Sequence, residues 1–200
     1  MSIPTKEQAS RFLAPIRGSL AILLLHDMQA KMDLSRFVLR CASLESLDTT
    51  VLDVDAFYCT NVDRLAEDAQ SIVEAEMLLL PENDFEVSSL LPLLSSRRAM
   101  LIIDDLNSLY SLATDVRKSH QLSIMMKLLS YNARMNGSWV IATAYRTELR
   151  AKEARTNQRS LTALGDLVVD AMSRDGSLTL KGESNGRWQN DELEIRTAHF

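Results

Sequence analysis

The sequence is short of the residues that build cross-linked, metal-bound or repetitive proteins. It has 6 glycines, 4 prolines, 2 cysteines and 3 histidines among 200 residues. So little glycine and proline excludes collagen-like and low-complexity chains, and a hydrophobic share of 46% excludes a disordered one. Cys41 and Cys59 lack metal-binding spacing and the histidines are scattered, so we expect no metal site. We interpret both cysteines as small buried hydrophobic residues in a reducing compartment.

Long hydrophobic runs and an excess of positive charge are also missing. The longest uncharged apolar run, Leu20 to Leu25, is far shorter than the ~20 residues that cross a bilayer. The first residues have neither the basic nor the apolar region of a signal peptide. We therefore expect a soluble intracellular protein, cytoplasmic or, in a eukaryote, nuclear, with no membrane partner. The net charge of −5 argues against a general polyanion binder, although a local basic loop can still bind one.

Short apolar runs alternate with helical patterns along most of the chain. The run at 19–25 is typical of a fully buried strand, and Leu34, Phe37, Val38 and Cys41 repeat at the spacing of one helical face. This alternation predicts an α/β fold with a mostly parallel central sheet flanked by helices. Strands are expected at 19–25, 49–57, 76–80, 99–106, 138–145 and 167–174, and helices at 5–14, 31–44, 61–74, 86–96 and 119–136.

Local signals mark the ends of several elements. Thr5 opens a capping box, and its helix should stop before Pro15. Ser119 is expected to cap the helix that Gly137 ends. Asp-Gly at 175–176 and Asn-Gly at 185–186 predict an antiparallel hairpin extension at the C-terminus. No repeat or linker interrupts the pattern, so we predict a single domain over 1–200 with its core at about 15–185.

The order of these parts resembles the ATPase core of the RecA/RadA recombinase superfamily, which includes KaiC-like proteins. Segment 25–32 (LHDMQAKM) falls in register with the phosphate-binding motif G-x-x-x-x-G-K-[ST], of which only Lys31 remains. The resemblance also aligns Asp55 with the family's water-activating glutamate and Asp104, at the end of LIID, with its Walker B aspartate. The resemblance covers roughly residues 15 to 185.

The departures from that motif remove the residues that allow a phosphate and its Mg²⁺ to bind. Leu25 and Ala30 replace the glycines that allow close backbone approach, and Met32 replaces the hydroxyl that binds Mg²⁺. Asp27 adds a negative charge inside the segment. We therefore expect no ATPase activity, no cofactor and no tight ATP binding. Lys31, Asp55 and Asp104 are then nucleotide-site remnants. We expect Lys31 to be a solvated residue near the start of a helix and the two acids to be inherited polar structure, although the acids can alternatively bind Mg²⁺ with a further ligand.

A basic segment follows the expected strand at 138–145. In the resembled family the loop at this place holds DNA, and flexible arginines suit phosphate neutralisation. A solvated surface loop or an exposed charged helix is the other interpretation. The candidate DNA-binding residues are Arg146, Arg150, Lys152, Arg155 and Arg159.

The resemblance implies three functions. The first is a non-catalytic RecA-family paralog that assists homologous recombination or DNA repair by binding single- or double-stranded DNA, a recombinase, or both, as a homo- or hetero-oligomer. The second is a structural subunit of an Elongator-like RNA-binding complex. The third is a weak ATP-binding KaiC-like protein.

Overall fold

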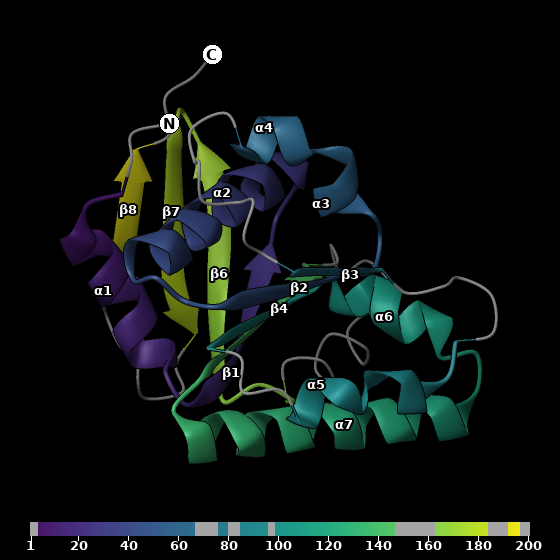
Figure 1. Ribbon diagram of the computed structural model, residues 1–200. Coiled ribbons are helices and arrows are strands. Elements are labelled where there is room, and N and C mark those ends of the chain that lie inside the picture. The colour runs from purple at the N-terminus through teal and green to yellow at the C-terminus, as the bar shows by residue number, and fades with distance from the viewer. Residues whose placement is uncertain are drawn as a thin grey trace.

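A mixed β-sheet forms the centre of the molecule (Figure 1). The computed structural model describes residues 4–66, 76–79, 85–95, 99–146, 163–183 and 192–196. Within these ranges the sheet has eight strands in the order β3-β2-β4-β5-β1-β6-β7-β8. The strands are β1 (Ser19–Leu25), β2 (Thr49–Asp53), β3 (Glu76–Leu79), β4 (Met100–Asp104), β5 (Trp139–Tyr145), β6 (Leu167–Arg174), β7 (Ser177–Glu183) and β8 (Glu192–Arg196).

Most of the sheet is parallel, and its antiparallel part lies at the C-terminal end of the chain. Strands β3, β2, β4, β5, β1 and β6 pair in parallel, whereas β6 with β7 and β7 with β8 pair antiparallel. The predicted α/β class, the mostly parallel sheet and the C-terminal antiparallel hairpin are therefore confirmed.

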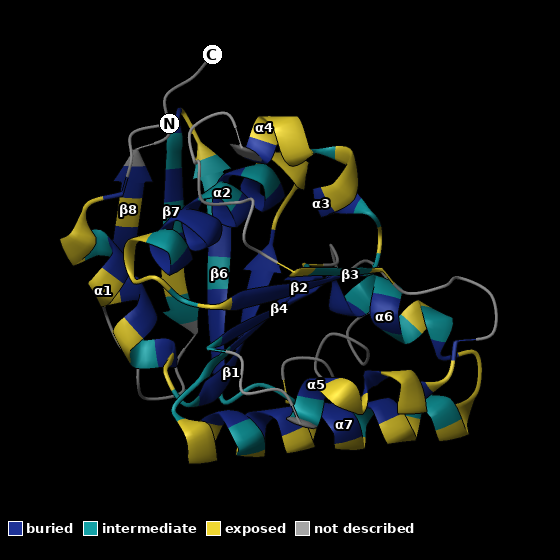
Figure 2. Cartoon of the chain, in the orientation of Figure 1, coloured by how far each residue is buried: buried dark blue, intermediate teal, exposed yellow. Residues whose placement is uncertain are grey.

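Helices cover both faces of the sheet, and each face has its own hydrophobic core (Figure 2). Helices α1 and α2 pack with Phe12 and Phe37 on one face, where the two rings meet edge to face at 5.1 Å. Helices α6 and α7 pack with Leu109 and Met126 on the other. The helices are α1 (Lys6–Ile16), α2 (Met28–Leu44), α3 (Phe57–Thr60), α4 (Val62–Ala66), the 3₁₀ helix η2 (Val87–Leu90), α5 (Pro92–Ser95), α6 (Leu106–Leu112) and α7 (Val116–Asn136).

The end of α1 and the start of α7 differ from the prediction because side chains outweigh local signals. Helix α1 continues through Pro15 to Ile16, whose complete burial favours one more turn. Helix α7 begins at Val116 because the Asp115 carboxylate accepts the Lys118 N–H at 2.7 Å, so Ser119 is not the cap. Its predicted end is confirmed, since Gly137 adopts φ 64°.

Most differences between the predicted and the observed helices lie at 57–112. Helix α4 confirms the start of the helix expected at 61–74, whose remainder lies outside the described residues. Helix α3 was not predicted, and the strand expected at 49–57 ends at Asp53. Pro92 divides the expected helix at 86–96 into η2 and α5. Helix α6 was not predicted, although Asp105 accepts the Ser108 N–H as its cap at 2.7 Å.

Two further expectations concern the hairpins and the cysteines. Asp175 and Gly176 both have positive φ and form the predicted β6–β7 turn. The Asn-Gly turn at 185–186 lies outside the described residues. Cys41 is buried as predicted, but Cys59 is exposed on α3, so its interpretation as a core residue is wrong. No helix in the described ranges is long and apolar enough to span a membrane.

Candidate functional site

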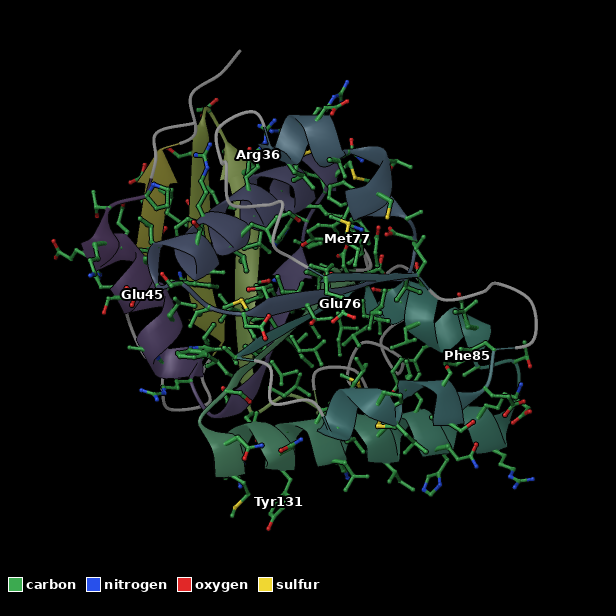
Figure 3. All side chains as sticks on the ribbon, in the orientation of Figure 1. Arg36, Glu45, Glu76, Met77, Phe85 and Tyr131 are labelled. Atoms are coloured by element: carbon green, nitrogen blue, oxygen red, sulfur yellow. The ribbon has the colours of Figure 1, made fainter. Side chains whose placement is uncertain are left out.

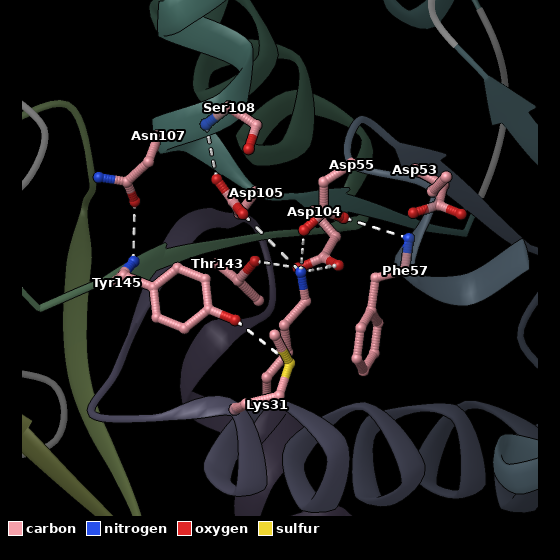
Figure 4. Close-up of polar contacts among 12 residues, drawn as sticks. Lys31, Asp53, Asp55, Phe57, Asp104, Asp105, Asn107, Ser108, Thr143 and Tyr145 are labelled. Carbon is pink, nitrogen blue, oxygen red and sulfur yellow. Dashed lines mark hydrogen bonds and ion pairs between the residues drawn. The ribbon is translucent and has the colours of Figure 1, made fainter. Parts of the chain in front are cut away.

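Three of the residues singled out from the sequence meet where β2 and β4 end (Figure 4). Asp53 and Asp104 are the last residues of these neighbouring parallel strands and lie opposite each other in the register. Asp55 follows two residues beyond the end of β2, and Lys31 reaches the same place from α2. The carboxyl ends of parallel strands are where α/β proteins build their sites.

Lys31 is fully buried, so the expectation that it is a solvated residue near a helix start is wrong. Carboxylates surround its ammonium group because it enters the space between the ends of β2 and β4. Its Nζ lies 2.7 Å from Asp55 Oδ2, 2.8 Å from Asp104 Oδ2 and 3.7 Å from Asp105 Oδ2. The Phe57 ring closes another side, with its centroid 4.4 Å from Nζ. A buried ammonium is stable only when it is paired in this way. Lys31 is therefore the cation that neutralises the ends of the two strands.

Burial and pairing act in opposite directions on the two central charges. Burial raises the pKa of Asp104 to about 6, and the Lys31 ammonium limits that rise. Burial lowers the pKa of Lys31, but the Asp104 and Asp55 carboxylates outweigh it and hold the pKa above its usual value. Thr143 on β5 donates its hydroxyl to the second Asp104 oxygen. Lys31 thus remains charged over the physiological range, whereas Asp104 titrates just below neutral pH.

The remaining carboxylates accept backbone N–H groups of α3 and α6, the helices that follow the two strands. Asp55 Oδ1 accepts the Phe57 N–H at 3.2 Å, and Asp53 Oδ2 accepts the Cys59 N–H at 2.9 Å. Asp105 uses its other oxygen to cap α6. These hydrogen bonds orient the three carboxylates around Lys31.

The segment that aligns with a phosphate-binding loop is a short turn into a helix. Only two residues separate Leu25, which ends β1, from Met28, which begins α2. Asp27 accepts the Ala30 N–H at 2.7 Å and so places its own carboxylate on the free amides of the helix. Free amides at a helix N-terminus are what an anion would use. A protein carboxylate already occupies that role here.

The residues do not fit a magnesium–nucleotide complex. Asp53, Asp55, Asp104 and Asp105 gather around Lys31, and Asp27 caps the helix that carries Lys31, so the net negative charge at this end of the sheet opposes a polyphosphate. Three of these acids offer oxygens within 4.8 Å of one another, a donor set that can hold a divalent cation. The Lys31 ammonium, however, already contacts two of the three.

The predicted basic loop is represented by one described residue. Arg146 follows β5, its backbone N–H donates to Leu25 O at 2.8 Å, and its guanidinium pairs with Asp170 on β6. This places Arg146 at the same edge of the sheet as the acidic cluster. The other four candidate DNA-binding residues, Arg150, Lys152, Arg155 and Arg159, lie outside the described residues.

Sequence reasoning missed Asp53, Asp105 and Thr143 as members of the cluster. A signal for the first two was present, because Asp105 directly follows Asp104 and Asp53 lies two residues before Asp55. Thr143 carried no such signal, since a threonine in an apolar run is typical of any strand.

The chain was compared with known proteins. No protein-family model matches it, and no curated protein matches it.

Proposed function

We propose that this chain is a RecA-like domain without nucleotide chemistry, which assists homologous recombination or DNA repair by binding DNA or a recombinase subunit. The main support for this proposal is that Lys31 contacts both Asp55 and Asp104. These positions were selected only by their places in the resembled motifs, 24 and 73 residues apart in the chain. Their convergence on one site supports the RecA-like layout.

The geometry of that site supports the non-catalytic part of the proposal. Lys31 is buried and paired, so it cannot reach a phosphate without leaving two carboxylates uncompensated. Asp27 repels a polyphosphate at the helix N-terminus where a cradle would be needed. The scaffold is thus suited to holding loops and surfaces in place rather than to hydrolysis.

Nucleotide binding is tested by thermal denaturation with ATP and Mg²⁺. A ligand that binds only the folded state raises its Tm. Because we propose that ATP does not bind, we expect no shift in Tm at millimolar nucleotide. The matched variant Asp27→Ser removes the carboxylate and retains a capping side chain, so its failure to bind ATP would point to the acidic cluster as the obstacle. A nucleotide-dependent rise in the Tm of the natural sequence contradicts the proposal.

DNA binding is tested by the mobility of a labelled single-stranded oligonucleotide at low salt. We expect a shift that weakens as salt rises, because released counterions drive phosphate binding. Replacing Arg150 and Arg155 together by alanine should weaken it, whereas the control pair Lys6 and Arg11 on α1 should not. Absence of a shift, together with failure to bind a purified recombinase, refutes the proposal; preference for transfer RNA favours an RNA-binding complex.

A further inference from the structure

Helix α7 carries an apolar stripe on the face that points away from the sheet. Its inner face already packs Leu122, Met126 and Leu129 into the core. A surface helix typically has only one such apolar face, so a second apolar stripe has another cause. The outer stripe repeats at i, i+4, i+7 and i+11, so its members share one face. It consists of Ile124, Leu128, Tyr131 and Met135, which are 47%, 45%, 61% and 66% exposed.

A groove runs beside this stripe, between α7 and the η2–α5 segment. It has a volume of about 380 Å³, and Val87, Leu91, Ile124 and Leu128 are among its lining residues. Leu91, on the opposite wall from α7, is 53% exposed. Figures 2 and 3 show exposed positions along the outer side of α7 and the Tyr131 side chain pointing away from the body of the protein. Contiguous exposed apolar surface of this kind marks an interaction site.

The charge of α7 identifies the partner's chemistry. Over Val116–Asn136 the helix has two arginines and two lysines and no acidic residue, in a chain whose net charge is −5. Lys118 pairs with Glu86 and Arg134 with Asp166. Arg117 and Lys127 are exposed, and no carboxylate in the described residues forms a salt bridge with either.

Competing occupants fit this combination less well. A second copy of the chain would bring two basic α7 helices face to face, which costs rather than gains electrostatic energy. Nucleic acid matches the positive charge but makes no use of four exposed apolar side chains. A flat anionic bilayer matches both, but it does not fill a groove bounded by Leu91 and the acidic Glu86. An acidic helix meets the charge, the stripe and the groove together.

We propose that the α7 groove binds an amphipathic acidic helix of a partner protein. The apolar ridge of the partner helix lies along Ile124, Leu128 and Tyr131. The carboxylates that flank this ridge on the partner helix pair with Arg117 and Lys127. This surface is separate from the acidic cluster, so it binds its partner whether or not the domain is RecA-like.

A fluorescein-labelled synthetic peptide tests the groove directly. The probe is an amphipathic helix of roughly 15 residues, about four turns, with leucines on one face and glutamates on the others. We expect fluorescence anisotropy to show that it binds at least about tenfold more tightly than a charge-reversed lysine version or a scrambled peptide of the same composition. Replacing Ile124 and Leu128 by serine should weaken binding by at least about tenfold. The control Val116→Ser, on the same helix but outside the groove lining, should leave binding unchanged.

Charge reversal gives an independent arm of the test. Replacing Arg117 and Lys127 together by glutamate should reverse the preference, so that the lysine peptide binds more tightly than the glutamate peptide. Equal binding of all three peptides, or no binding below about 1 mM, overturns the proposal. Binding of phosphatidylglycerol vesicles or of an oligonucleotide that is lost in the same two variants, without peptide binding, also overturns it and identifies a membrane or nucleic-acid surface instead.

Discussion

Lys31→Met is the substitution that most directly tests the buried ion cluster. Methionine keeps the length and apolar stem of the side chain but removes its charge. Lys31 and Asp104 are both fully buried, whereas the Asp55 side chain is 27% exposed and can be hydrated in the variant. Removing one member of a buried pair costs about 3–5 kcal/mol because the other charge is left uncompensated. We expect a loss of that size in the free energy of unfolding at pH 8.

The pH dependence of that loss has a definite sign. The pKa of Asp104 is about 6 in the folded protein and 3.8 ordinarily, so its ionisation weakens the fold as pH rises through 6. Without the Lys31 ammonium, which lowers this pKa, Asp104 binds its proton more tightly still. The gap in stability between the natural sequence and Lys31→Met should therefore be small near pH 5 and grow towards pH 8.

Urea denaturation followed by circular dichroism between pH 5 and pH 8 measures this gap. Adding Asp104→Asn to the variant removes the uncompensated charge and should restore about 2 kcal/mol at pH 8, since a neutral pair is far less costly to bury. The exposed Lys127→Met is the matched control and should change stability by less than about 0.5 kcal/mol. A loss below about 1 kcal/mol at pH 8, or one that does not vary with pH, refutes the reasoning.

Three further predictions concern other parts of the fold. Burial raises the pKa of the Cys41 thiol, so a thiol reagent should label only the exposed Cys59 in the folded protein. The variant Cys59→Ser should then lose rapid labelling, and fast reaction of both thiols contradicts this prediction. Asp27→Ala should lower stability by about 1 kcal/mol in thermal or urea unfolding, because the first turn of α2 loses its cap, whereas Asp27→Asn should retain most of it. Gly165→Ala should destabilise the protein by roughly 1–3 kcal/mol, because an added Cβ would lie 2.9 Å from two carbons of Ile22; an unchanged urea midpoint would show that this contact relaxes freely.

The sequence was sufficient to predict the sheet because its strands are strongly marked. The seven residues of β1 are all buried, and their apolar run predicts a buried strand without knowledge of the strands beside it. The Asp-Gly turn at 175–176 was equally clear, since few residues adopt positive φ twice in succession. Strand order was not predictable, because nothing local to β1 indicates that it pairs with β5 on one side and β6 on the other.

Helix starts were less predictable, because they depend on which of several polar side chains turns back onto the backbone. Asp115 and Ser119 are both competent caps, and the choice of Asp115 lengthens α7 by one turn. The same holds for Asp27, which begins α2 before Lys31 instead of at it. That difference of three residues matters chemically, because part of the segment aligned with the phosphate-binding motif forms the first turn of a helix.

The burial of Lys31 also explains which parts of the resembled motif are present under the proposed function. Under that proposal, Leu25 at the end of β1 and Met32 in α2 stand where the resembled motif has uncharged residues, so neither difference leaves a buried charge unpaired. Lys31 and Asp104 differ, because replacing either alone leaves the other buried and unpaired. Changing one member of such a pair alone is therefore costly whether or not a nucleotide binds. A lysine and an aspartate at these positions are therefore no sign of ATPase activity by themselves, and only the conformation of the backbone ahead of the lysine distinguishes a working phosphate site from its remnant.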